Sequence, residues 1–252
     1  MLPSFPVRAR RGLAALFAAA LALAPAIASA GEAVAAPSFD VEKALIDLLT
    51  RRPELVRNAL AEMTRRDEEA KAAAGKAMLK RMTGAIYDTK GSTVLGNPNG
   101  DVTVVVFLDY HCPYCHKIEP TLEALIQKDR GVRILIKQLP ILGPGSTEAA
   151  RMMLVNGQND RTPRLQKALM AATVLDPPTL AALRKEYHVA SVTPPQVDAA
   201  LDEVRALSTA LGIEGTPAVI IGEILAPGAI DDEPLARLVM AQRALKTAHA
   251  SL

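Results

Sequence analysis

The chain has 252 residues, half of them hydrophobic, a size that can bury one substantial core with a smaller element attached. Its formal net charge of +2 offers no strongly basic surface, so no nucleic-acid partner is expected. It contains only two cysteines, which excludes a framework of several disulfides and a structural zinc site with four cysteine ligands.

The first thirty residues have the pattern of an export signal. Three arginines precede an apolar run over 12–24, and the small residues at 28–30 form a cleavage site. The run is too short for a comfortable membrane span. We expect residues 1–30 to be removed as a signal peptide, which changes the net charge from +2 to −1. Later cleavage or retention as an anchor are the alternatives. The mature protein is expected in the periplasm, where disulfides persist.

Residues 31–84 are predicted to form an N-terminal helical extension. Asp40 can cap a first helix, and Pro53 suits the first position of a second helix. Residues then recur at alternating spacings of four and three, the pattern of a helical seam. The seam residues are Val56, Leu60, Met63, Asp67, Ala70, Ala74 and Ala77. Because one is charged and three are alanine, two interpretations stay open: a stalk over 38–82 that builds a homo-oligomer, or an amphipathic helix laid on the catalytic domain.

The segment from 85 to 252 is predicted to be an α/β domain. An edge strand is expected near 86–87, followed by a tight turn. The unbroken β-branched run over 102–108 predicts a strand covered on both faces. A helix over 113–128 and a strand over 132–139 follow, and a unit of this length implies a right-handed parallel connection.

A helical insertion is predicted over about 144–211, because a structureless loop of that length would be improbable. Its helices are expected at about 146–157, 161–174, 178–187 and 194–211. A short hairpin around Gly222-Glu223 and a last helix from Asp231 to about Ala248 complete the domain.

Cys112 and Cys115 carry the predicted chemistry. The order strand, loop, helix places the first sulfur at a helix N-terminus, where backbone N–H groups favour a thiolate. The thiolate is the form that attacks disulfides. Pro113 fixes φ in the first helical turn without the loss of a hydrogen bond. Cys115, one turn inward, is expected to be the protected resolving thiol. We expect a redox-active Cys112–Cys115 disulfide and no further cofactor. A chance cysteine pair, or half of a shared metal site, is the alternative.

Other residues near the motif have roles that the sequence leaves open. His111 and His116 can tune the thiolate, join the sulfurs in binding a soft metal, or stand in solvent without either role. Asp109 is either a proton acceptor or a turn residue at the strand end, and the turn is favoured. Pro217 directly precedes an apolar strand, a place where proline is tolerated.

These features resemble the DsbA-like branch of the thioredoxin superfamily over about 85–250. The stretch 107–115, the helical insertion, Thr216-Pro217 before a strand, and 226–229 before the last helix occur in the family's order. The resemblance implies a thioredoxin fold with an inserted helical subdomain and an N-terminal helical extension. It also implies that Pro217 is a cis-proline packed against the active-site disulfide, and that Thr216 helps to select substrates and to tune the redox potential.

The chain departs from the founding oxidase of that family at two positions. Tyr114 stands where that enzyme has histidine, and Val106 stands where it has a buried acid, so strong oxidation is not implied. Tyr114 and the helical extension look more like ScsC-type and related isomerase-like periplasmic proteins, whose N-terminal segments oligomerise. An oligomer holds several active sites around one misfolded client, which suits disulfide shuffling.

The sequence thus predicts an exported thiol–disulfide oxidoreductase that forms or isomerises disulfides in cysteine-containing exported proteins and exchanges electrons with a membrane redox partner. The alternative is a copper-handling or client-binding periplasmic protein that uses the same cysteine pair as a soft-metal site. A glutathione-dependent enzyme shares the motif, but the export signal and the insertion count against it.

Overall fold

The computed structural model describes residues 40–250, so the predicted signal peptide over 1–30 lies outside the described residues. The chain divides into two compact units, 1–56 and 57–252.

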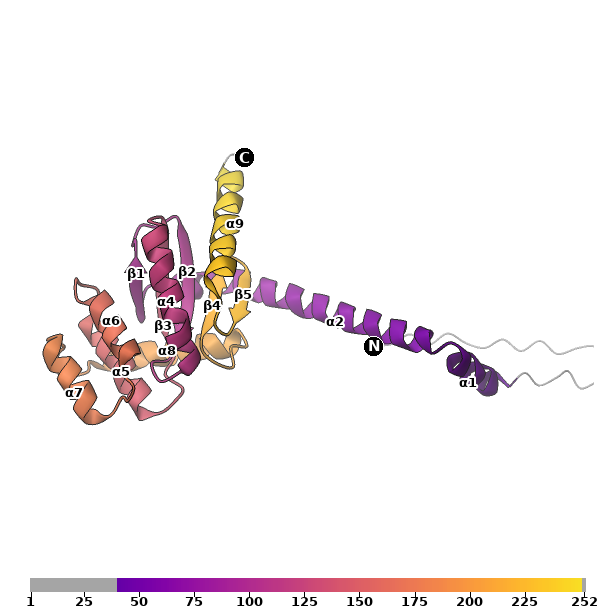
Figure 1. Cartoon of the computed structure of the whole chain (residues 1–252), viewed down its shortest axis with the longest axis horizontal. Coiled ribbons are helices and arrows are strands. Elements are labelled where there is room, and N and C mark those ends of the chain that lie inside the picture. The colour runs from indigo at the N-terminus through magenta and orange to yellow at the C-terminus, as the bar shows by residue number, and fades with distance from the viewer. Residues whose placement is uncertain (1–39, 251–252) are drawn as a thin grey trace, which may run out of the picture. The chain divides into compact units, whose positions relative to one another are not determined.

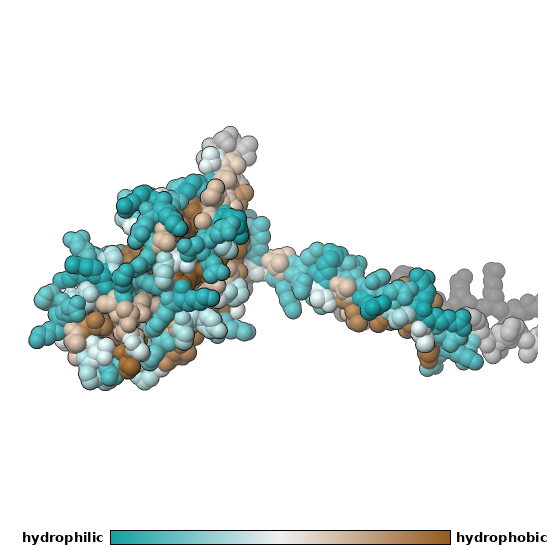
Figure 2. Space-filling view, viewed as in Figure 1, coloured by the Kyte–Doolittle hydropathy of each residue, from teal (hydrophilic) through white to brown (hydrophobic). Residues whose placement is uncertain are grey.

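The first unit contains α1 (Val41–Arg51) and the start of α2 (Pro53–Arg81). Asp40 caps α1, because its carboxylate accepts a hydrogen bond from the backbone N–H of Lys43 at 3.0 Å. No residue of α1 is buried. Figure 2 shows apolar side chains at the surface among charged ones along α2. Within residues 40–250 no helix, α2 included, is long and apolar enough to cross a membrane.

The second unit is built on a five-stranded sheet with the order β1-β3-β2-β4-β5 (Figure 1). The strands are β1 (Ser92–Gly96), β2 (Val102–Leu108), β3 (Val132–Gln138), β4 (Ala218–Ile221) and β5 (Ile224–Pro227). β2 and β3 are parallel, and the other neighbouring pairs are antiparallel. β2 is buried along its whole length, which confirms the expectation of a strand covered on both faces.

Helices cover both faces of this sheet. The helices of this unit are the end of α2, α3 (Thr83–Tyr87), α4 (Pro113–Lys128), α5 (Pro144–Asn156), α6 (Thr162–Ala171), α7 (Pro177–Glu186), α8 (Pro195–Ala210) and α9 (Asp232–Ala250). Among them, α7 packs against α5 and α6. Val104 and Ile134 face one apolar cluster, to which α4 and α9 contribute. Val105 and Leu135 face a second cluster, formed with α3, α8 and the end of α2. Helices α5 to α8 occupy the segment between β3 and β4, where four helices were expected.

The predicted edge strand near 86–87 is wrong, because this segment forms α3 and the edge strand is β1, further along the chain. The buried ammonium of Lys137 on β3 donates hydrogen bonds to the carbonyl oxygens of Ala85 at 3.1 Å and Asp88 at 2.6 Å. These carbonyls lie at the C-terminal end of α3, where a helix lacks internal partners and favours a cation. Because Lys137 lies about 50 residues further along the chain, the sequence around 86–87 has no pattern that indicates this contact.

Candidate active site

The cysteine pair lies at the start of α4, directly after the turn that follows β2. Cys112 is the N-cap residue of the helix and Pro113 is its first residue. The carbonyl oxygen of Cys112 accepts hydrogen bonds from the backbone N–H groups of Cys115 at 2.9 Å and His116 at 3.1 Å. The first helical turn therefore closes around the motif. This is a position where free backbone N–H groups can stabilise an anionic sulfur.

The two sulfurs have different surroundings. Neither cysteine is in a disulfide, so the structure describes the dithiol. Cys112 is 5% exposed, whereas Cys115 has no exposed surface. Burial is the main cause that raises the pKa of the Cys115 thiol, and the neighbouring Cys112 sulfur raises it further. Cys115 is therefore held as a neutral thiol near neutral pH.

The loop before β4 meets the motif at Cys112. The Thr216–Pro217 peptide bond is cis, as the resemblance implied. The thiol of Cys112 donates a hydrogen bond to the carbonyl oxygen of Thr216 at 3.0 Å, across 104 residues of sequence. A sulfur that bonds to Cys112 must therefore lie beside Thr216 and Pro217.

Asp109 anchors the loops around the motif. Its buried carboxylate accepts hydrogen bonds from the backbone N–H groups of His111 (2.7 Å), Ile141 (2.7 Å) and Leu142 (2.9 Å). It also accepts one from the hydroxyl of Ser146 on α5 at 2.6 Å. These contacts agree with the turn interpretation. They show in addition that Asp109 joins the turn before Cys112 to the loop after β3.

A buried hydrogen-bonded chain lies behind the motif, and sequence analysis missed it. The phenol of Tyr110 donates to the amide oxygen of Gln166 on α6 at 2.6 Å and accepts from the amide of Gln138 on β3 at 3.1 Å. Gln166 in turn donates to the carboxyl group of Glu119 at 3.4 Å. In the sequence, the only sign of this hydrogen-bonded chain is a polar residue, buried in the structure, in each of three separate elements: Glu119 in α4, Gln138 in β3 and Gln166 in α6.

The two histidines have different environments. The ring nitrogen Nε2 of His116 lies 2.7 Å from the carbonyl oxygen of Tyr110, and His111 is exposed. Within residues 40–250, no group of three or more histidine, cysteine or acidic side chains is placed to hold a metal ion.

Exposed apolar side chains lie in the motif and in the loop that Asp109 joins to it. Tyr114, the residue after Pro113, is 63% exposed. Ile141 and Leu142 are also exposed, and Asp109 ties their backbone to the turn before Cys112.

Comparison with known proteins adds three findings. A family model described as thioredoxin matches residues 88–241. The catalytic domain of ScsC from Proteus mirabilis is 31% identical, with a TM-score of 0.63, over 67% of this chain and 98% of that one. A periplasmic thioredoxin-like protein from Salmonella enterica serovar Typhimurium is 29% identical, with a TM-score of 0.61, over 65% of this chain and 96% of that one.

A shorter match joins the chain to a curated relative. The thiol:disulfide interchange protein DsbA of Burkholderia cepacia is 43% identical over 44 residues. This match spans 18% of the chain and only 20% of the relative's own length.

Proposed function

Because the chain belongs to the thioredoxin superfamily, in its DsbA- and ScsC-like branch, we propose that it is a periplasmic enzyme that forms or isomerises disulfides in exported proteins through Cys112 and Cys115. The observation that carries this proposal is the placement of Cys112 at the N-cap of α4, beside Thr216, with Cys115 buried one turn further on. The α/β thioredoxin fold with inserted helices, which the comparisons confirm, holds these residues in place.

In the oxidising direction, a client thiolate attacks the sulfur of Cys112 in the Cys112–Cys115 disulfide. A client–Cys112 bond forms, and Cys115 leaves and takes up a proton, which its raised pKa favours. A second client thiolate then attacks the client sulfur of the mixed disulfide. Cys112 leaves as the thiolate, and the client gains a disulfide while the enzyme gains two electrons. No bound cofactor is needed, because the two sulfurs carry these electrons.

In isomerisation, the thiolate of Cys112 attacks a wrong client disulfide and forms the same mixed disulfide. The released client thiolate attacks another client disulfide, and the thiolate freed there attacks the client sulfur of the mixed disulfide, so Cys112 leaves as the thiolate and no electrons are transferred overall. If Cys115 loses its proton and attacks Cys112 instead, the client leaves with two reduced sulfurs and the enzyme is oxidised to the Cys112–Cys115 disulfide. A net oxidase must pass its two electrons to an acceptor, for which we propose a membrane redox partner.

The client is proposed to be a cysteine-containing exported protein with unfolded, apolar segments. The exposed side chain of Tyr114 in the motif supports this client class, as do those of Ile141 and Leu142, whose backbone Asp109 ties to the turn before Cys112. The export pattern over 1–30 and the periplasmic Salmonella relative support the compartment. We further propose that residues 38–82 bring copies of the chain together, because α1 buries none of its apolar residues.

Trapping of the mixed disulfide tests the proposed mechanism. Cys115→Ala lacks the resolving thiol, so it should accumulate covalent complexes with a scrambled ribonuclease, visible on a non-reducing gel. The matched variant Cys112→Ala should form none and should lose insulin reduction and ribonuclease refolding. Equal trapping by both variants, or full activity of Cys112→Ala, would contradict the proposal. The equilibrium redox potential of the pair against glutathione then separates oxidase from isomerase, since about 30 mV corresponds to a tenfold change in equilibrium.

A further inference from the structure

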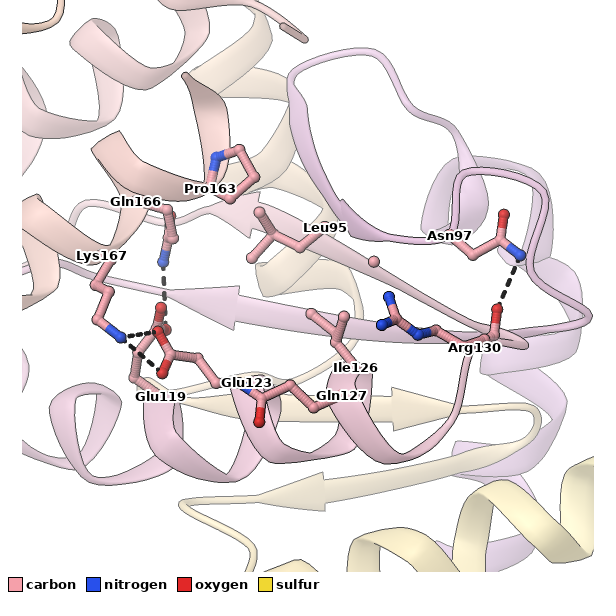
Figure 3. A pocket seen from close by; sticks show the side chains of 11 residues that line it. Leu95, Asn97, Glu119, Glu123, Ile126, Gln127, Arg130, Pro163, Gln166 and Lys167 are labelled. Carbon is pink, nitrogen blue, oxygen red and sulfur yellow. Dashed lines mark hydrogen bonds and ion pairs between the residues drawn. The ribbon is translucent and has the colours of Figure 1, made fainter. Parts of the chain in front are cut away.

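A pocket of about 580 Å³ lies between α4, α6 and the end of β1 (Figure 3). Its volume is in the range of small-molecule sites. None of the residues proposed for disulfide exchange lines it. Leu95 of β1, Ile126 of α4 and Pro163 of α6 form its apolar wall.

The pocket contains a buried carboxyl group, that of Glu119. This residue is only 8% exposed. Among the described residues, its carboxyl group has one hydrogen bond, a long one of 3.4 Å from the amide of Gln166. A carboxylate can accept about four hydrogen bonds, and a buried one with so few is costly. Accordingly, burial raises the pKa of Glu119 from 4.5 to about 7.

The charged neighbours do not balance Glu119. Lys167 of α6 is already paired with both oxygens of Glu123, at 2.8 and 2.9 Å. Glu123 raises the pKa of Glu119 more than Lys167 lowers it. Behind Gln166 lies the phenol of Tyr110, whose own pKa is raised by burial, so it is neutral. β1 lines the pocket with no titratable side chain. The other cation of the lining, the exposed Arg130, lies near Asn97, at the far end from Glu119 (Figure 3). When Glu119 ionises, this end of the pocket therefore has one uncompensated negative charge.

We propose that this pocket binds an organic cation, whose protonated amine or guanidinium group pairs with Glu119 while its apolar part lies against Leu95, Ile126 and Pro163. Figure 3 shows the polar groups of Glu119, Gln166 and Lys167 together at one end, with Leu95 and Ile126 further along. At the Glu119 end, a neutral ligand leaves the charge of this carboxylate uncompensated, and an anionic group is repelled by it. The Tyr110 phenol holds Gln166, and Gln166 contacts the carboxyl group, so the acceptor is fixed in place. This binding is separate from disulfide exchange.

Three probes of equal length test the proposal: n-hexylammonium, hexan-1-ol and hexanoate. Each is titrated into the chain without its export signal, and amide chemical shifts are followed by NMR. The cation should shift the resonances of Glu119, Gln166 and Lys167 in a saturable manner. The alcohol and the carboxylate should bind at least about tenfold more weakly, since neither forms the charge-assisted contact. Equal binding of the three probes, or no saturable binding of the cation up to its solubility limit, overturns the proposal.

A variant and a pH series give independent checks. Glu119→Gln keeps the size of the side chain and should lower the affinity for hexylammonium at least about tenfold. Asp202→Asn, which removes a carboxylate from an exposed position on α8, should leave the affinity unchanged. In the unmodified chain, the affinity should weaken about tenfold for each pH unit below about 7, because Glu119 must ionise to pair with the cation. Undiminished binding by Glu119→Gln, or affinity independent of pH, overturns the proposal. Neither outcome bears on exchange through Cys112.

Discussion

Cys112 and Cys115 are the same chemical group in two environments. Cys112 keeps a small exposed surface at the N-cap of α4, while Cys115 lies inside the first turn with none. Because burial penalises the charged form, the pKa of Cys115 is raised. Solvent access and ionisation therefore favour the same division of roles, in which the client bonds to Cys112.

Alkylation of single-cysteine variants measures this difference. Cys115→Ala retains Cys112, and Cys112→Ala retains Cys115. At pH 7 the first variant should react with iodoacetamide at least about tenfold faster, because the thiolate is the reactive form. Mass spectrometry of timed samples gives the two rates, and both variants should react alike after unfolding in urea. A slower reaction at Cys112 than at Cys115 would remove the basis of the mechanism.

The four hydrogen bonds to Asp109 predict that its substitution lowers the stability of the fold more than substitution of an ordinary turn residue. In Asp109→Asn the side chain keeps one acceptor oxygen and turns an NH₂ group toward backbone N–H donors. We expect the free energy of unfolding to fall by about 2–3 kcal/mol, as several hydrogen bonds to a buried charged group are lost. Urea denaturation measures the change. Ser146→Ala, which removes one partner, should cost about 1 kcal/mol, and an equal loss in both variants would refute the anchoring role.

The helix α4 contributes residues to both proposed sites, from two of its faces. Its first turn holds the cysteine pair, and Ile118 and Leu122 pack into the core beneath the sheet. Glu119, Glu123 and Ile126 recur at the spacing of three and four residues that places side chains on one helical face. That face lines the pocket opposite α6. A single element thus connects the redox site to the proposed cation site.

The helix α1 makes too few contacts within itself to be stable alone. An isolated helix of 11 residues is marginal in water, and the large apolar side chains of α1 are exposed. We expect Leu45→Glu combined with Leu48→Glu to convert an oligomer into a monomer, measured as mass by light scattering after size-exclusion chromatography. Lys43→Glu, at an exposed polar position of the same helix, should keep the oligomer. A monomeric unmodified chain would contradict the proposed stalk.

The stability of the whole molecule should depend on pH through Glu119. Its pKa is about 7 in the folded state and 4.5 for an unperturbed group, so the folded state binds the proton more tightly. Below pH 4.5 both states are protonated and the buried group costs nothing. As the pH rises through about 7 the cost grows to roughly 3 kcal/mol.

Glu119→Gln should therefore stabilise the protein by up to about 3 kcal/mol at pH 8 and have little effect at pH 4. Urea denaturation at the two pH values measures the difference. Glu123→Gln, a partly exposed member of an ion pair, should change stability by less than about 1 kcal/mol at either pH. A gain that is equal at both pH values would exclude a buried ionising carboxyl group.

Local patterns predicted much of this architecture. The run over 102–108 and the helix over 113–128 have the predicted bounds, because a β-branched run and a proline-started amphipathic helix are determined by neighbouring residues. The helix α3 was missed because its end is satisfied by Lys137, far along the chain. The exact isomer at Pro217 followed from the resemblance and not from the pattern around it.

By itself, the sequence determined the cysteine pair and its place at the start of a helix, since Cys112, Pro113 and Cys115 lie within one turn. Only the tertiary structure decided which distant groups meet: the Thr216 carbonyl at Cys112, the donors around Asp109, and the side chains that form the pocket at Glu119. The physical reason is the sequence distance over which each kind of interaction acts. Helix and strand preferences act between residues a few positions apart, whereas burial and hydrogen-bond partners depend on which distant segments the fold brings into contact.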